Sequence, residues 1–142
     1  MRILGIDWGE ARLGLAVSDE TQTLASPYKV VPNDGQALAA VIRVAADIGA
    51  VEIVVGLPLT LAGEEGPTAA DVRAFAADLQ GVVAVPVKLV DERLTTKVAE
   101  QKLRAAGRRA AEIKKAADAS AAALILQTYL DARKNAPGAP AL

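Results

Sequence analysis

The fold is decided near the start of the chain by Arg2-Ile3-Leu4-Gly5-Ile6-Asp7-Trp8-Gly9, an apolar run that holds one carboxylate between two glycines. A second apolar run at 13–17 follows, and the pair predicts two strands joined by a tight turn. Alternation along the first strand puts Asp7 on the same face as Ile3 and Gly5. A carboxylate on an apolar face is costly unless a cation pairs with it. Asp7 is therefore either a functional residue or a turn-entry Asp that caps amides of the hairpin.

The composition favours one globular domain. The chain has 142 residues and 52% hydrophobic content, which suits a single core. No apolar run is long enough to cross a membrane, and the first residues show a strand pattern rather than an export signal, so we expect a cytoplasmic protein. We expect the domain to span residues 1–134 and the Pro- and Ala-rich residues 135–142 to form a flexible tail.

Two residue types are missing from the sequence. Cys is absent, which excludes disulfides and thiolate metal sites, and His is absent, which removes the commonest general base and zinc ligand. Catalysis would then depend on carboxylates, lysines, hydroxyls or a hard metal ion bound by oxygen.

Basic residues gather in one segment of a chain whose net charge is −1. Residues 95–115 carry seven basic and two acidic side chains, a net +5, which leaves −6 for the rest. The pattern indicates either a local anionic partner such as nucleic acid or a solvated helix face. The seven basic residues, which are candidates for nucleic-acid binding, are Lys97, Lys102, Arg104, Arg108, Arg109, Lys114 and Lys115.

Hydrophobic periodicity and the positions of Gly and Pro divide the rest of the chain into elements. After a third strand (26–31) we expect a helix (36–48) and a strand (51–55) that ends at Gly56-Leu57-Pro58. A second helix then begins at Pro67, and a fifth strand lies within 82–90. Two more helices follow, one from Asp91 to about Ala106 and a last one from about 115 to 133. The fold class is α/β: three antiparallel strands, then two parallel ones, form a five-stranded mixed sheet with helices on both faces.

The predicted topology brings further acids toward Asp7. Right-handed crossovers would place the fourth strand beside the first, and ligands of open α/β sheets favour such switch points. The fifth strand ends at the same edge, with Asp91 and Glu92. Because adjacent residues at a strand end point to opposite faces, only one of these two acids would face Asp7. The alternative is that both are first-turn acids of the next helix.

Asp118 is the third candidate acid. It stands at helical spacing from Ala121, Ala122 and Ile125, so it would share their apolar face, and the alanines would let the helix lie close against the sheet. A favourable interaction with the helix dipole is the simpler explanation of this carboxylate. Three acids on separate elements at one edge nevertheless predict Mg²⁺ or Mn²⁺ binding, and such sites commonly hold two ions about 3.5–4 Å apart.

Four blocks of the sequence together match a known pattern. They are Gly5-Ile6-Asp7-Trp8-Gly9, Val54-Val55-Gly56-Leu57-Pro58-Leu59 with Gly63, Asp91-Glu92-Arg93-Leu94-Thr95-Thr96, and Asp118-Ala119-Ser120-Ala121-Ala122 leading to Ile125-Leu126-Gln127. In this order they closely resemble the YqgF family, also called RuvX, of bacterial RuvC-like nucleases. The resemblance covers nearly the whole chain.

The resemblance implies an RNase H-like fold and a nuclease that depends on Mg²⁺ or Mn²⁺. It implies that Asp7, Glu92 and Asp118 are the catalytic and metal-binding residues, with Asp91 less favoured than Glu92. One departure is that relatives of the RuvC type carry an acid at the end of the fourth strand, where this chain has Gly56-Leu57-Pro58.

The resemblance also implies a nucleic-acid substrate. The expected role is processing of the 5′ end of the 16S ribosomal RNA precursor in ribosome biogenesis, and the alternative is resolution of Holliday junctions in DNA. The partner would be an RNA precursor or branched DNA, and the protein a monomer or a homodimer.

Two other functional classes are compatible with parts of the pattern. A sugar-kinase or actin-like ATPase also opens with a Gly-x-Asp-x-Gly strand, but it needs two such domains and this chain has room for one. A catalytically silent nucleic-acid-binding module would keep the fold without the chemistry, and the presence of all three acids argues against it.

Overall fold

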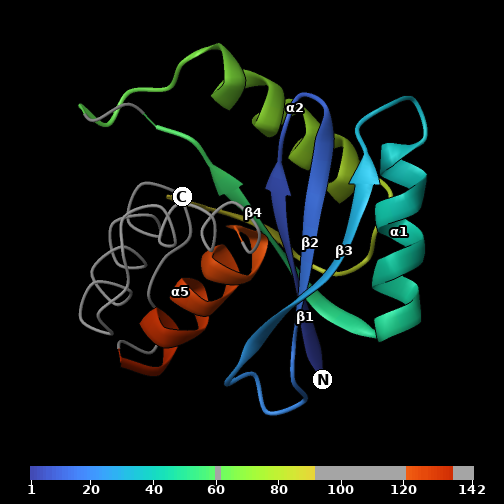
Figure 1. Ribbon diagram of the computed structural model, residues 1–142, viewed down its shortest axis with the longest axis vertical. Coiled ribbons are helices and arrows are strands. Elements are labelled where there is room, and N and C mark those ends of the chain that lie inside the picture. Colours follow the sequence, from blue (N-terminus) through green and yellow to red (C-terminus); the bar gives the residue numbers. More distant parts are fainter. Residues whose placement is uncertain (60–61, 92–120, 136–142) are drawn as a thin grey trace, which may run out of the picture.

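The computed structural model describes residues 1–59, 62–91 and 121–135. Within these ranges it contains five strands and three helices, most of which are labelled in Figure 1. In chain order they are β1 (Arg2–Trp8), β2 (Arg12–Ser18), β3 (Ala25–Pro32), α1 (Ala37–Ile48), β4 (Ala50–Leu57), α2 (Pro67–Gln80), β5 (Val87–Asp91) and α5 (Ala121–Asn135). The expected third helix, the beginning of the last helix and residues 136–142 of the tail lie outside the described residues, and the division into domain and tail stays a prediction.

The five strands form one mixed sheet in the order β3-β2-β1-β4-β5. β1 pairs with β2, and β2 with β3, in antiparallel fashion, whereas β1–β4 and β4–β5 are parallel pairs. The prediction that the fourth strand lies beside the first is therefore confirmed. The chain direction switches at β1, so the strand that carries Asp7 lies at the centre of the sheet with neighbours of opposite orientation.

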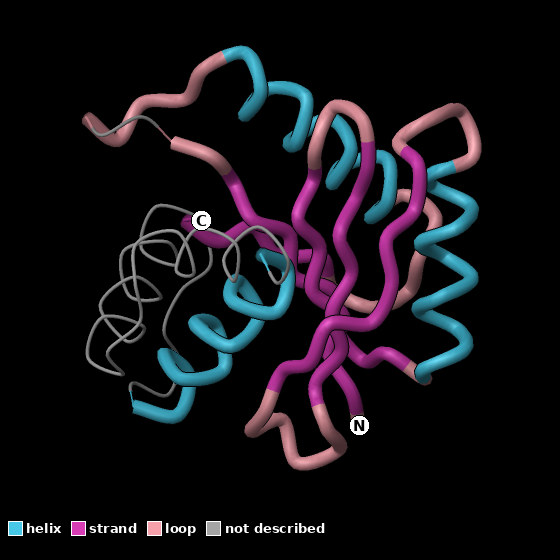
Figure 2. Tube along the Cα trace, viewed as in Figure 1, coloured by secondary structure: helices cyan, strands magenta, loops and turns pink. Residues whose placement is uncertain are grey.

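Each face of the sheet has its own helices and its own core (Figures 1 and 2). On one face, Leu4 and Ile6 of β1 pack with buried residues of α1 and α2. On the other face, Ile3 packs with Ala16, Val54 and buried residues of α5. The alternation predicted for the first strand is thus confirmed, and Asp7 lies on the face that α5 covers.

The helix boundaries follow local sequence signals. α1 is followed by Gly49, whose φ of 65° is a left-handed conformation that residues other than glycine rarely adopt. α2 begins with Pro67 at its first position, where a missing backbone N–H costs nothing. Its last residue is followed by Gly81, which keeps a right-handed conformation. The predicted end of the first helix at residue 48 and the predicted start of the second at Pro67 are therefore confirmed.

β4 and β5 both continue beyond the last residues predicted for them. β4 continues through Gly56 and Leu57, which pair with Val90 and Asp91 of β5. The expectation that Gly56 ends the fourth strand and that Asp91 leaves the fifth is wrong, because pairing between the parallel strands offsets the weak strand propensity of glycine and aspartate. As a result Asp91 is the last residue of β5.

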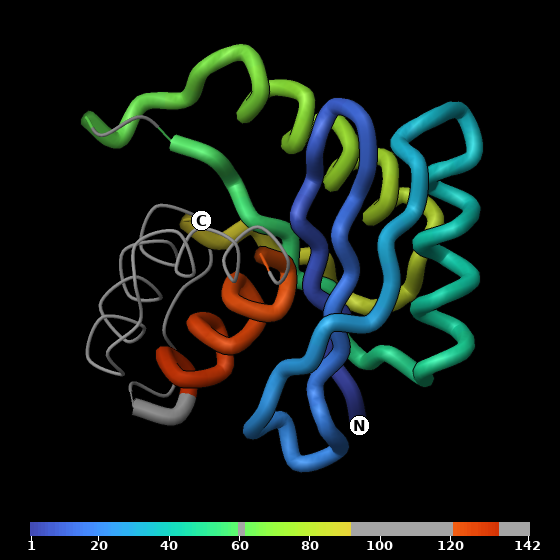
Figure 3. Tube along the Cα trace, in the orientation of Figure 1, coloured from blue at the N-terminus to red at the C-terminus, as the bar shows by residue number. Residues whose placement is uncertain are grey.

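α5 lies unusually close to the sheet, and Figure 3 shows this late helix beside the first strands. A Cβ added to Gly5 would come within 2.8 Å of the Leu126 Cβ and 3.3 Å of the Ala122 carbonyl oxygen. Gln127 fixes the helix against the edge strand, since its Oε1 accepts from the Ala25 N–H at 2.8 Å and its Nε2 donates to the Thr23 carbonyl at 2.9 Å. The expected close approach of the alanine-rich helix is confirmed.

No described helix combines the length and the apolar character that a membrane crossing requires. The cytoplasmic location remains a prediction.

Candidate active site

Asp7 is the next-to-last residue of β1 and lies opposite Gly14 of β2. Its side chain is half-buried on the α5 face. The carboxyl ends of β1, β4 and β5 meet at this edge, because the three strands are parallel to one another. The strand that decides the fold therefore presents a carboxylate at the edge where open α/β sheets bind their ligands.

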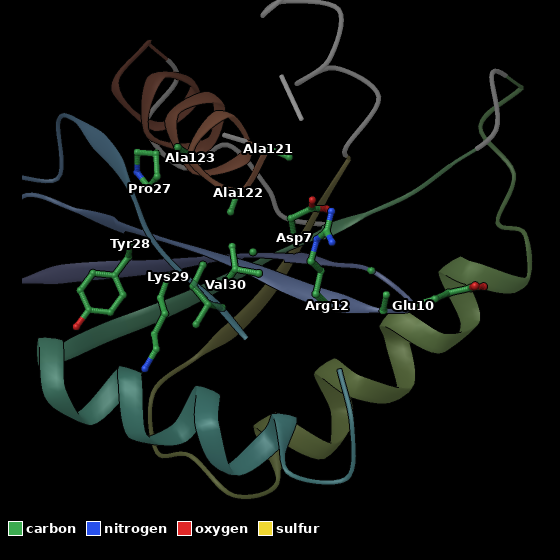
Figure 4. A pocket seen from close by; sticks show the side chains of 14 residues that line it. Asp7, Glu10, Arg12, Pro27, Tyr28, Lys29, Val30, Ala121, Ala122 and Ala123 are labelled. Carbon is green, nitrogen blue, oxygen red and sulfur yellow. The ribbon is translucent and has the colours of Figure 1, made fainter. Parts of the chain in front are cut away.

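A groove opens over this end of the sheet (Figure 4). Its floor includes Asp7, Arg12 and Gly14 from the first two strands. Its sides include residues 27–30 of β3 and residues 121–123 at the described start of α5. Figure 4 shows Asp7 pointing toward the α5 side of the sheet, whereas Tyr28 and Lys29 point toward α1. Asp7 is thus the carboxylate that faces the groove from the centre of the sheet.

Small residues leave space beside Asp7. A Cβ added to Gly14 would lie 3.8 Å from the Asp7 Cβ and 3.6 Å from the Ala122 Cβ. A methyl group therefore fits there at ordinary contact distance, and a larger side chain would fill the space between the carboxylate and α5.

The turn that follows Asp7 is held from a distant part of the chain. Asn33, just after β3, donates from its Nδ2 to the Gly9 carbonyl at 2.6 Å, and its backbone N–H donates to the Ala11 carbonyl at 3.1 Å. A Cβ on Gly9 would come within 2.7 Å of the Arg12 carbonyl oxygen, so the turn requires glycine there. The sequence did not reveal this role of Asn33, since no local pattern indicates a partner so far along the chain.

The other predicted site residues lie outside the described residues. This applies to Glu92 and Asp118, and to all seven basic candidates, Lys97, Lys102, Arg104, Arg108, Arg109, Lys114 and Lys115. Asp91 is described, and it pairs with Leu57, whose side chain is buried on the face of α1 and α2. Asp91 therefore occupies a position on the face opposite to Asp7.

The sequence analysis did not single out Arg12, which lines the groove. Its position beside Asp7 follows from the register of the two strands, which the structure gives. Arg12 and Gly14 are two residues apart in β2, and Gly14 is opposite Asp7, so alternation puts the arginine on the face of the carboxylate.

A buried polar cluster holds the middle and end of α5 to the sheet, away from the groove. Glu52 of β4 is only 7% exposed and accepts a hydrogen bond from the Tyr129 hydroxyl at 2.8 Å. The Lys88 Nζ lies 3.0 Å from one carboxylate oxygen of Glu52, and the Arg133 Nη1 lies 3.3 Å from the other. The guanidinium of Arg133 also stands 5.5 Å from the centre of the Tyr129 ring. Two cations and one hydroxyl thus compensate the buried charge.

The surroundings in this cluster raise the pKa of two of its members, Lys88 and Tyr129. The hydrogen bond to Glu52 raises the pKa of Lys88, because the carboxylate favours the charged ammonium. Burial raises the pKa of the Tyr129 hydroxyl, and the hydrogen bond that it donates to Glu52 acts in the same direction. Both groups hold their protons more strongly in the folded protein than in water.

Of the three acids that the sequence predicts to bind metal, the described part of the chain contains Asp7. Its residues include no group of three or more acids placed to bind one ion. Asp7 provides a hard oxygen donor, and the absence of a side chain at Gly14 leaves room beside it. Both features fit a hard cation such as Mg²⁺ or Mn²⁺.

Comparison with known proteins gives one consistent family. The family model described as RuvX, Holliday junction resolvase, matches residues 1–132. A relative from Chloroflexus aggregans is 47% identical over 94% of this chain and 95% of its own length. A relative from Anaeromyxobacter dehalogenans is also 47% identical, over 94% and 98%. Both bear the name "Putative pre-16S rRNA nuclease".

Comparison with solved structures identifies proteins with a similar fold. The RuvC protein of T. thermophilus, in complex with a Holliday junction substrate, is similar with a TM-score of 0.56 and 22% identity over 94% of this chain and 96% of that one. A second Thermus thermophilus RuvC structure gives a TM-score of 0.52 at 21% identity, over 95% and 97%. At this level of identity the likeness concerns the fold alone, and it confirms the predicted RNase H-like architecture. The chain belongs to the RuvX family of nucleases, as its four sequence blocks predict.

Proposed function

We propose that this protein hydrolyses phosphodiester bonds of structured nucleic acid with divalent metal ions, and that Asp7, Glu92 and Asp118 are its catalytic and metal-binding residues. The observation that carries the proposal is the position of Asp7. Its carboxylate faces a groove at the carboxyl edge of the sheet, on the strand where the chain direction switches. Because the chain belongs to a nuclease family, we interpret this carboxylate as part of a nuclease active site.

The alternation of β5 favours Glu92 over Asp91 as the second ligand. Lys88 contacts Tyr129 of α5, and Val90 packs against the α5 core, so both lie on the face of Asp7. Asp91 comes next and is paired with Leu57 on the opposite face. If the alternation continued by one residue, position 92 would fall on the face of Asp7. β5 is separated from β1 only by β4, and neighbouring strands lie about 4.8 Å apart.

Helical spacing favours Asp118 as the third ligand. It precedes Ala121 by three residues, so the chain keeps the two Cα atoms within about 11 Å. Ala122 lies against the position of Gly14, which is opposite Asp7. A residue four positions before Ala122 on a continuous helix would share the face that looks toward Asp7.

The metal, when bound, would stabilise the negative charge that develops on the phosphate during hydrolysis and promote attack by water. The side chains of the protein position the metal and the substrate. The three carboxylates would hold the cation, and the turn fixed by Asn33 keeps Asp7 at the edge of the groove. The basic residues between Lys97 and Lys115 attract the phosphate backbone.

The names of the relatives support precursor 16S ribosomal RNA as the substrate, and hence a role in ribosome biogenesis in the cytoplasm. The description of the family model favours a second candidate, the Holliday junction. A manganese-dependent digestion panel separates the two. It sets a 16S precursor, single-stranded RNA, single-stranded DNA and a four-way junction side by side. Cleavage at the 5′ end of the precursor alone supports the first, and symmetric cuts in the junction, which require a homodimer, support the second.

The proposed chemistry is tested with Asp7→Asn, which keeps the shape of the side chain and removes its charge. We expect this variant to lose cleavage of every nucleic acid that the native protein cuts, while it still binds them. The matched control is Asp47→Asn, since Asp47 is an exposed acid of α1 on the far side of the sheet. Cleavage by Asp7→Asn at the rate of the control would overturn the assignment.

A further inference from the structure

Arg12 is a cation that the strand pairing fixes beside Asp7. It is the first residue of β2, two residues before Gly14, which is opposite Asp7 in the antiparallel pair. Ala16, two residues beyond Gly14, belongs to the core under α5, so alternation puts Arg12 on the same face. The two side chains are thus diagonal neighbours, an arrangement that brings long side chains within reach of one another. Figure 4 shows Arg12 rising from β2 at the end of the groove where Asp7 lies.

The guanidinium of Arg12 is available to an incoming anion. The side chain is exposed, and within the described ranges it forms no hydrogen bond or ion pair. Two other arginines differ in this respect, since Arg73 pairs with Glu65 and Arg133 with Glu52. The backbone of Arg12 is nevertheless fixed, because β2 is paired on both sides and the Arg12 carbonyl lies against Gly9. A charge that has no partner among the described residues, carried by a strand with a fixed backbone in a groove, suits an anion.

We propose that Arg12 binds a backbone phosphate of the nucleic acid, either the scissile phosphate or the one next to it, and so sets the position of the substrate strand relative to Asp7. This inference rests on the proposed function, and it names the binding contact on the β2 side of the groove. Guanidinium suits the task because its planar array of N–H donors matches two phosphate oxygens at once. Arg12 is then a positioning residue that recognises phosphate and no particular base.

Binding measurements test the contact without cleavage. All proteins carry Asp7→Asn so that the substrate stays intact, and fluorescence anisotropy reports the affinity for the nucleic acids of the digestion panel. We expect Arg12→Ala to weaken binding about tenfold or more, because charge-assisted hydrogen bonds are among the strong ones. The slope of log affinity against log salt should become shallower by about 0.7–0.9, the value of one phosphate contact. Arg12→Lys should restore the salt slope but only part of the affinity, since a lysine keeps the charge and loses the planar fork.

The matched control is Arg43→Ala. Arg43 is an exposed arginine of α1, which covers the other face of the sheet. We expect this variant to bind like the Asp7→Asn parent. Equal affinity and equal salt slope for Arg12→Ala and Arg43→Ala would overturn the proposal for Arg12.

A substrate modification identifies the phosphate and excludes a purely structural role. A neutral methylphosphonate is placed at the scissile position or at one of its neighbours, one position at a time. At the position that Arg12 contacts, the modification should weaken binding by the parent and have little further effect on Arg12→Ala. Equal effects on both proteins at every position would mean that Arg12 acts on the fold or on Asp7 rather than on the substrate, and would overturn the proposal.

These measurements distinguish an error about the Arg12 contact from an error about the proposed nuclease function. If the native protein cuts, Asp7→Asn does not, and Arg12→Ala matches Arg43→Ala, then only the Arg12 contact is wrong. If the native protein binds none of the four nucleic acids, both proposals are wrong.

Discussion

Asn33 donates a hydrogen bond from its side-chain amide to the Gly9 carbonyl over 2.6 Å, although 24 residues separate the two positions. The bond joins the end of β3 to the turn between β1 and β2, two residues after Asp7. A second bond, from the backbone N–H of Asn33 to the Ala11 carbonyl, has a length of 3.1 Å. The conformation of the turn beside the proposed catalytic carboxylate is therefore set by a residue outside the hairpin.

Asn33→Asp should destabilise this turn, because it replaces the amide donor with a carboxylate that faces a carbonyl oxygen. We expect a loss of roughly 1–3 kcal/mol in the free energy of unfolding, together with slower cleavage. Urea unfolding followed by circular dichroism measures the first effect and the digestion panel the second. Gln22→Glu is the control, since it makes the same chemical change at an exposed contact with the Met1 carbonyl. A variant as stable and active as this control would contradict the role of Asn33.

Gly5→Ala should force β1 and α5 apart. The added Cβ would lie 2.8 Å from the Leu126 Cβ, and both atoms are fixed directly to backbone. Overpacking of this kind costs roughly 1–3 kcal/mol, and the shift of α5 should also reduce cleavage. Gly35→Ala is the control, because a Cβ at Gly35 has no atom within 4 Å. Thermal unfolding of the two variants tests this prediction. Equal melting temperatures would show that α5 can shift away from β1 without a loss of stability.

Tyr129→Phe should weaken the attachment of α5 without opening a cavity. The variant removes the hydroxyl that donates to Glu52 at 2.8 Å and leaves a buried carboxylate with one partner fewer. We expect a loss of about 1–3 kcal/mol in the free energy of unfolding, measured in urea. Tyr28→Phe serves for comparison, since Tyr28 is 47% exposed on the edge strand. The prediction fails if both changes have the same small effect.

The same cluster should make the protein less stable at alkaline pH. The folded state raises the pKa of Lys88 above its ordinary 10.5 and that of Tyr129 above its ordinary 10.0. A group with a raised pKa stabilises the folded state fully below its unfolded pKa, and this stabilisation is lost as the pH rises through the folded pKa. The contribution is therefore present below about pH 10 and declines above it.

Urea unfolding at a series of pH values from about 8 to about 11 measures this decline. Lys88→Met combined with Tyr129→Phe removes both titrating groups, so its stability should fall less steeply with pH than that of the native protein. Parallel curves would show that the decline has another origin.

The fold could be predicted in most of its parts because each depends on a local pattern. Alternation in β1 assigned Asp7 to its face, and Pro67 and Gly49 marked the start of one helix and the end of another. The extension of β4 through Gly56 could not be predicted, because it depends on pairing with β5, which is distant in sequence. The hydrogen bond from Asn33 to Gly9 could not be predicted for the same reason, because its two residues are distant in sequence. For the site, the sequence indicated Asp7 and missed Arg12, since an arginine at the start of a strand carries no signal until the strand register is known.

The close packing of α5 on the first strands has a consequence for synthesis. The ribosome completes β1 and β2 more than a hundred residues before the end of α5. At about 5–20 residues per second, the early strands wait roughly 5–25 seconds for this helix. Until it docks, Ile3, Ala16 and Val54 lack the apolar cover that they have in the finished fold. A nascent chain therefore exposes one apolar face of its sheet, and the groove is complete only after translation has passed α5.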